Sequence, residues 1–170
     1  TSMDLPLGNA VGNVLEIIEA IETLKGKGPT DLKTISLELA SHMVYLAGNG
    51  DIDYCRKKAK EALDNRKALE KLRELVKAQG GNEEVLDNYS LFKQALYKYE
   101  LISETEGYIE SINAMLVGKA SIMLGAGRET KDSPIDHSAG IYLCKKAGME
   151  IKKGDILAIL YTNKESSMEK

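Results

Sequence analysis

Three things are scarce in this sequence: excess positive charge, long apolar runs and residues that commonly bind metals. The net charge is -3 over 170 residues, so the chain has no basic surface of the kind that nucleic-acid-binding proteins use. No apolar run approaches the ~18 residues of a membrane span. We therefore expect neither nucleic acid nor a membrane among its partners.

Cysteine and histidine are also rare. Cys55 and Cys144 are far apart in the sequence and lack the spacing of a metal site, which favours reduced thiols in a cytoplasmic protein. His42 and His137 are the only imidazoles, and neither has a Ser, Cys or Asp partner at a recognisable motif spacing. Packed or surface histidines are therefore favoured over catalytic ones.

What remains is typical of a soluble globular protein, with 43% hydrophobic and 29% charged residues. Residues 8 to about 79 have helical periodicity. We expect Thr30 and Asp51 to be helix N-caps and Gly80–Gly81 to end a fourth helix, with a weak short helix near residues 83–87. The first helix is predicted from one apolar stripe: Val11, Val14, Leu15, Ile18 and Ile21.

From about residue 97 the pattern changes. "LYKYELIS", "GYIESIN", "HSAGIYLCKKAG" and "DILAILYTN" are typical of strands, and "AMLVGKASIMLGAG" of a helix. The sequence thus predicts a helical part over residues 1–96 and a mixed α+β module, with hammerhead or barrel-like strands, over 97–165.

Two motifs of this second half have competing interpretations. "LGAGRETK", with Arg128, could cradle an anion, but its glycines follow the predicted helix and therefore favour a helix C-cap. Lys119 and the "KKGDILAIL" turn suggest a biotinyl or lipoyl carrier. That chemistry needs a lysine at an exposed hairpin tip, whereas Lys119 lies in a predicted helix, so an unmodified structural cousin is favoured.

The opening stretch could hold a hard cation. "PLGNAVGN" places backbone carbonyls at a turn, and the helix after it carries Glu16, Glu19 and Glu22. The alternative is that these glutamates are simply solvated on an exposed side of the helix.

The same stretch carries a family resemblance. "TSMDLPLGNAVGNVLEIIEA" resembles the family pattern Thr-x-Met-x-x-Pro-Leu-Gly followed by Gly-Asn-x-Leu-Glu in pyrimidine-nucleoside and thymidine phosphorylases. "LGAGRETKDSPIDHSAGIYL" resembles the Leu-Gly-Ala-Gly-Arg and Ile-Asp-His elements of their carboxyl-terminal domain. The resemblance covers nearly the whole chain and implies an α/β fold: a helical layer of the family's large α/β domain, followed by its mixed α+β module.

The resemblance also implies a function for a longer parent protein. Family members cleave uridine, thymidine or deoxyuridine with phosphate and release the free base and a pentose 1-phosphate. The family's phosphate loop and base-binding residues have no counterpart here, so we expect no catalytic or substrate-binding residue in these 170 residues and no activity of the chain alone. The parent is expected to be a cytoplasmic homodimer that binds phosphate and nucleoside, with contacts through a further α domain.

The resemblance further implies a potassium ion and no organic cofactor. Its ligands from this stretch would be the backbone carbonyls of Leu7 and Ala10 and the carboxylate of Glu19. The remaining ligands would come from the absent phosphate loop. The alternative for Glu19 is an N–H or lysine partner within the fold.

Overall fold

A computed structural model describes residues 3–128 and 130–164. Thr1, Glu129 and Glu165, which belong to the predicted motifs and boundaries, lie outside the described residues. The chain forms two compact units: residues 1–17 together with 92–170, and residues 18–91. The expected boundary at residues 96/97 follows a change in composition. The amino-terminal residues nevertheless belong with the second half of the chain, because their strand pairs there. The mixed α+β class expected from the sequence is confirmed.

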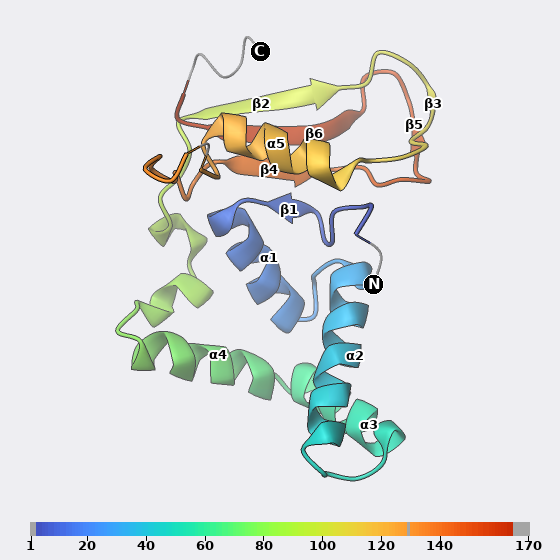
Figure 1. Cartoon of the computed structure of the whole chain (residues 1–170), viewed down its shortest axis with the longest axis vertical. Helices are drawn as coiled ribbons and strands as arrows, with labels where there is room; N and C mark the ends of the chain where they lie inside the picture. Colours follow the sequence, from blue (N-terminus) through green and yellow to red (C-terminus); the bar gives the residue numbers. More distant parts are fainter. Residues whose placement is uncertain (1–2, 129, 165–170) are drawn as a thin grey trace. The chain divides into compact units, whose positions relative to one another are not determined.

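The first unit is built on a four-stranded antiparallel sheet in the order β1-β4-β6-β2 (Figure 1). Its strands are β1 (Ala10–Val11), β2 (Tyr97–Ile102), β4 (Gly140–Leu143) and β6 (Ile156–Thr162). A separate two-stranded sheet pairs β3 (Gly107–Tyr108) with β5 (Glu150–Ile151). The expected strand "GYIESIN" is therefore limited to its first two residues, and β1 was not predicted at all.

The core of this unit lies between the sheet and α5 (Ala114–Leu124) (Figure 1). Asn113 caps the start of α5 by accepting a hydrogen bond from the Leu116 N–H at 3.0 Å. Gly125 ends the helix in the left-handed region at φ 106°. "LGAG" is thus a helix C-cap, as its order in the sequence predicted. The buried cluster comprises Leu124, Ile141, Leu143 and Ala158, with Val11, Val117, Ala120 and Leu160 packed against it.

A polar cluster joins the ends of this unit's elements. Asp136 accepts hydrogen bonds from the Ser138 hydroxyl at 2.8 Å and from the Asn163 amide at 2.6 Å. Asn163 in turn accepts one from the Leu96 N–H at 2.7 Å. Burial raises the pKa of Asp136, but the hydrogen bonds from Ser138 and Asn163 outweigh it and leave that pKa below its ordinary value.

The second unit is helical. Its helices are α1 (Asn13–Leu24), which begins in the first unit, α2 (Thr30–Leu46), α3 (Ile52–Asp64) and α4 (Lys67–Ala78), followed by the short 3₁₀ turns η1 (Glu83–Leu86) and η2 (Tyr89–Leu91). Its most deeply buried apolar side chains are spread over α1, α3, α4 and η1: Ile21, Cys55, Leu63, Leu69 and Leu86.

Helix starts show where the local signals succeeded and failed. Asp51 caps α3 as predicted, by accepting a hydrogen bond from the Tyr54 N–H at 2.8 Å. Thr30 is not a cap, which corrects the prediction, because Thr30 is already the first residue of α2. Pro29 occupies the N-cap position, and no side-chain hydrogen bond caps the helix there. Val11 likewise lies in β1, and α1 begins two residues later.

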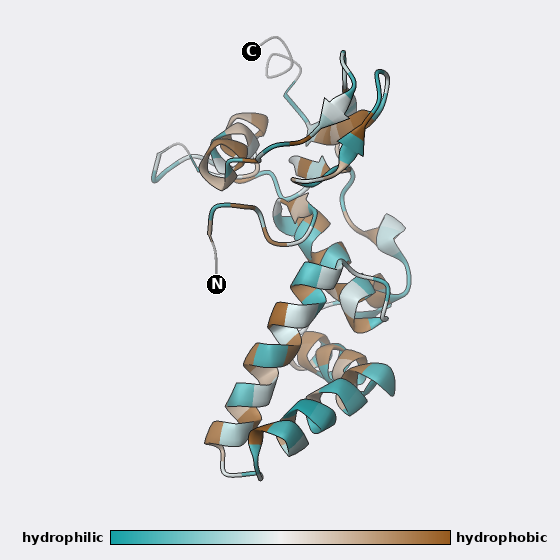
Figure 2. Cartoon of the chain, turned by 90° about the vertical axis from the view of Figure 1, so that its right-hand side faces the viewer, coloured by the Kyte–Doolittle hydropathy of each residue, from teal (hydrophilic) through white to brown (hydrophobic). Residues whose placement is uncertain are grey.

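Hydrophobic residues recur along the long helix α2 (Figure 2). Within residues 3–128 and 130–164, none of the helices has both the length and the apolarity needed to span a membrane.

Candidate functional site

The segment proposed for potassium binding is tied into the first unit by its backbone oxygens. Pro6 O accepts a hydrogen bond from the Lys146 ammonium at 3.0 Å, and Asn9 O accepts one from the Leu143 N–H at 2.7 Å. Asp4 O accepts a third from the Ala114 N–H at 3.1 Å. The turn containing Leu7 is therefore anchored on both sides.

Strand pairing sets the direction of the Ala10 carbonyl. In an antiparallel ladder, alternate residues direct their backbone groups toward the partner strand. Asn9 O bonds to β4 and Val11 pairs with Ile141, so Ala10 directs its own carbonyl away from β4. Because β1 is the outermost strand of the sheet, that carbonyl faces away from the ladder, as a ligand oxygen requires.

Close backbone packing holds this turn against the loop before β4. A Cβ on Gly12 would lie 2.5 Å from Ala139 O, and one on Gly140 would lie 2.3 Å from Val11 O. Val14 N–H also donates to His137 O at 3.0 Å. The two glycines therefore permit an approach that any side chain would prevent, and they fix where α1 begins.

The three predicted ligands have different environments. Leu7 is 44% exposed and Ala10 is 4% exposed, both in the first unit. Glu19 is 8% exposed on α1 and belongs to the second unit. Glu19 is therefore buried, and the convergence of the three groups on one ion stays a prediction.

The predicted donor set consists of two backbone carbonyls and one carboxylate. Among the residues that the structure describes, no cluster of three His, Cys, Asp or Glu side chains could hold a metal. A cation here would therefore depend on neutral carbonyls and one carboxylate. Carbonyl oxygens are ligands for hard cations, and the outward-facing carbonyl of Ala10 fits that demand.

Both histidines lie at the surface, as predicted. The His42 side chain is 54% exposed and lies 3.3 Å from the Glu38 carboxylate. His137 is exposed, with its Nδ1 2.6 Å from the Asn13 side-chain amide.

The structure also shows where Lys119 and Arg128, the key residues of the two competing motifs, lie. Lys119 is exposed on α5, within a helix and away from any hairpin tip, so it does not meet the geometry of a carrier lysine. Arg128 follows the carbonyl end of α5, whereas anions favour the N–H end of a helix.

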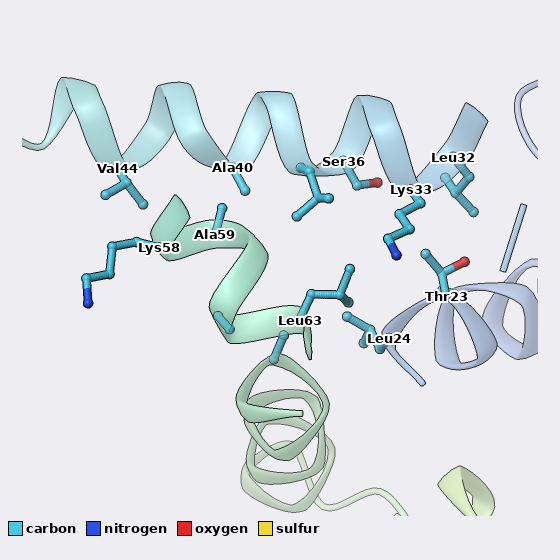
Figure 3. Close-up of a pocket in the computed structure, with 14 residues that line it drawn as sticks. Thr23, Leu24, Leu32, Lys33, Ser36, Ala40, Val44, Lys58, Ala59 and Leu63 are labelled. Carbon is cyan, nitrogen blue, oxygen red and sulfur yellow. The ribbon is translucent and has the colours of Figure 1, made fainter. Parts of the chain in front are cut away.

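An apolar groove in the second unit was not predicted from the sequence. It has a volume of about 480 Å³ and is open to solvent between α1, α2, α3 and α4. In Figure 3, Ala40 and Val44 of α2 point toward α3, where Ala59 and Lys58 lie, and Leu63 lies about one turn further along α3. Alanines form much of the wall. Ala59 and Ala62, three residues apart on α3, are the sequence signal that could have indicated it.

A second missed feature is a polar cluster of the same unit. Tyr89 donates to the Glu22 carboxylate at 2.5 Å, and the Lys25 ammonium donates to Leu86 O at 2.5 Å. Lys25 also lies 4.9 Å from the centre of the Tyr89 ring. Burial, followed by the hydrogen bond to Glu22, raises the pKa of the Tyr89 phenol well above its ordinary value. These contacts fasten η2 to α1.

Comparison with known proteins identifies relatives over almost the entire sequence. Residues 108–170 match the family model of the pyrimidine nucleoside phosphorylase C-terminal domain. The pyrimidine-nucleoside phosphorylase of Bacillus subtilis is 44% identical over 98% of this chain, and that of Geobacillus stearothermophilus is 44% identical over 97%. The enzyme of Staphylococcus haemolyticus is 42% identical over 98%.

The match covers only part of each relative. The chain spans 39% of the length of the Bacillus subtilis protein and 38% of that of Geobacillus stearothermophilus. By sequence, the chain is similar to a carboxyl-terminal part of pyrimidine-nucleoside phosphorylases, and its residues 108–170 match the C-terminal domain of that family.

Proposed function

We propose that this chain is the carboxyl-terminal part of a pyrimidine-nucleoside phosphorylase, and that it acts only together with the rest of the family's fold. The observation that carries the proposal is the 44% identity over 98% of the chain, set against coverage of 39% of the relative. Of the sequence features expected for the reaction, the phosphate loop and the base-binding residues have no counterpart in this sequence.

The proposed reaction is phosphorolysis of a pyrimidine nucleoside, such as uridine, thymidine or deoxyuridine. Phosphate attacks the sugar as the glycosidic bond opens, and the base leaves with negative charge that hydrogen bonds and cationic groups stabilise. Bringing the two substrates together supplies much of the rate enhancement. This chain would contribute a rigid wall, made of the sheet, α5 and the anchored β1 turn. The whole enzyme is proposed to be a cytoplasmic homodimer.

Potassium belongs to the same proposal. Leu7 and Ala10 would supply carbonyl oxygens and Glu19 a carboxylate, with further ligands from outside these 170 residues. A bound ion would supply fixed positive charge beside the phosphate. The support is the outward direction of the Ala10 carbonyl and the burial of Glu19.

The test is to join this chain to the part of the Bacillus subtilis relative that lies outside the match, as one polypeptide. We expect release of uracil from uridine only when phosphate is present. This chain alone should release none above background. Turnover by the chain alone, or a joined protein that folds but does not cleave uridine or thymidine, would contradict the proposal.

The potassium ligands are tested in the joined protein. Glu19→Gln keeps the size of the side chain and removes its charge, so we expect a higher potassium concentration for half-maximal activity. Glu16→Gln is the matched control on the same helix. An unchanged potassium dependence for Glu19→Gln would remove Glu19 from the ligand set.

A further inference from the structure

A lysine from the far end of the chain holds the opening turn. The ammonium of Lys146 donates to Pro6 O at 3.0 Å, across 140 residues of sequence. Both residues are half-buried and belong to the first unit. The accepting carbonyl is bonded directly to the nitrogen of Leu7, whose own carbonyl is a predicted potassium ligand. This contact therefore acts on the backbone beside that ligand.

The turn that carries Lys146 is itself fixed by hydrogen bonds. Lys146 O accepts one from the Met149 N–H at 3.1 Å, and the Gly148 N–H donates to Ile109 O at 2.7 Å. Gly148 has a φ of 84°, in the left-handed region that glycine adopts at little cost. The backbone of Lys146 is thus held in place, and its side chain reaches Pro6 from a fixed point.

The segment that Lys146 contacts lies outside any helix or strand. Residues 3–9 precede β1, and Gly8 has a φ of 67°, which interrupts regular backbone there. Bonds from other loops hold Asp4 O and Asn9 O near the two ends of the segment. The bond from Lys146 acts between these points, next to Leu7, where no ladder of strand hydrogen bonds sets the direction of a carbonyl.

An ammonium suits this task, because it offers three N–H donors to neutral oxygens. It also brings a positive charge near the proposed ion, and like charges repel. The two effects on potassium binding have opposite signs. Positioning of the Leu7 carbonyl by Lys146 strengthens binding, whereas repulsion by its charge weakens it. Removal of the ammonium therefore shows which effect is larger.

We propose that Lys146 is a positioning residue for the potassium site, and that its bond to Pro6 O sets the backbone from which the Leu7 carbonyl reaches the ion. The inference rests on the proposed function, because the ion belongs to that proposal. Lys146 itself touches neither the ion nor a substrate.

The experiment uses the joined polypeptide described under Proposed function. Its thermal unfolding midpoint is measured against potassium chloride, with choline chloride keeping the ionic strength constant. An ion that binds only the folded state raises the midpoint. Lys146→Met keeps an unbranched side chain and removes the ammonium. We expect the potassium concentration for half of the full rise to increase about fivefold or more.

Two further variants separate positioning from general damage. Lys146→Arg retains a cationic N–H donor and should keep most of the native potassium dependence. Lys153→Met is the matched control, because Lys153 is exposed in the turn before β6, and it should change nothing. Saturating potassium should also restore kcat of Lys146→Met, since the ligands themselves remain.

Hydrogen exchange gives a second readout that needs only this chain. The backbone amides of residues 7–9 should exchange faster in Lys146→Met than in the native chain, and those of α5 should stay unchanged. Equal exchange of residues 7–9 in the two proteins would overturn the inference.

The potassium titration separates this inference from the proposed function. A native joined protein that responds to potassium, with Lys146→Met responding at the same or a lower concentration, overturns the positioning role alone. The same holds if Lys146→Arg behaves like Lys146→Met, or if Lys153→Met shifts the dependence equally. A native joined protein that gains no stability from potassium overturns this inference together with the proposed ion, and its cleavage of uridine still tests the reaction separately.

Discussion

The two units of this chain bury their apolar residues in different ways. The unit of residues 1–17 and 92–170 has a continuous cluster between α5 and the sheet, with Ile141 and Ala158 at its centre. The helical unit of residues 18–91 buries single side chains on separate helices and leaves a stripe and a groove on α2 exposed. One unit closes its own core, and the other leaves apolar side chains of α2 exposed.

The two units therefore differ in how their buried side chains contribute to stability. The residues that match the C-terminal domain model lie wholly in the unit with the closed core, as expected for a part that folds around its own apolar residues. The helical unit buries Ile21, Leu63, Leu69 and Leu86 on separate elements, and it leaves apolar side chains of α2 exposed. Substitutions should therefore separate the two units clearly.

Gly140→Ala should have the largest effect, because it disrupts the closed unit. A Cβ there would lie 2.3 Å from a backbone oxygen that cannot move aside easily. We expect a loss of about 3 kcal/mol in the free energy of unfolding, measured by urea denaturation. Gly118→Ala is the control: its Cβ meets nothing within 4 Å inside α5, so it should be neutral or stabilise by up to about 1 kcal/mol. Equal effects of the two variants would contradict the close packing.

Asp136→Asn should have the next largest effect, in the same unit. It weakens the bonds from Ser138 and Asn163, at a cost of about 1–2 kcal/mol. Because the folded state holds the pKa of Asp136 below its unfolded value, its contribution is present above about pH 4 and is lost as the pH falls further. Denaturation between neutral pH and pH 3 should show a steeper acid loss for the native chain than for the variant. Parallel curves would remove Asp136 from this role.

Much of this architecture could be predicted from local signals. The Asp51 cap, the glycine after α5 and the alternation in β2 and β6 depend on neighbours in sequence, so they were found. The strand β1 was not, because two residues become a strand only through pairing with β4, about 130 residues away along the chain. The groove was not predicted because it forms only when side chains from four helices come together in the folded chain. Leu7, Ala10 and Glu19 came from family resemblance, and local chemistry alone left them undecided.

Tyr89→Phe tests the fastening of the helical unit and should have a smaller effect. It removes the hydrogen bond to Glu22 and should cost about 1 kcal/mol. Because the pKa of Tyr89 is raised in the folded state, its contribution is complete below about pH 10 and is lost as the pH rises beyond that value. An absorbance titration of the phenols in the folded chain should show one late-ionising tyrosine that the variant lacks. An unchanged titration would contradict the contact.

Arg56→Gln should have the smallest effect. Its guanidinium bridges Glu38 of α2 and Asp53 of α3 with nitrogen–oxygen distances of 2.6 and 3.1 Å, but the groups are exposed, and such pairs contribute little in water. We expect the urea midpoint to stay unchanged. A clear loss would show that the helical unit depends on surface charge for its stability.

Hydrogen exchange of the chain tests most directly the claim that one unit closes its core and the other leaves much of α2 uncovered. Backbone amides of α5 and β6 should exchange slowly, and those of α2 around Leu39 to Leu46 should exchange much faster. Protection of α2 equal to that of the sheet in the chain alone would contradict the account.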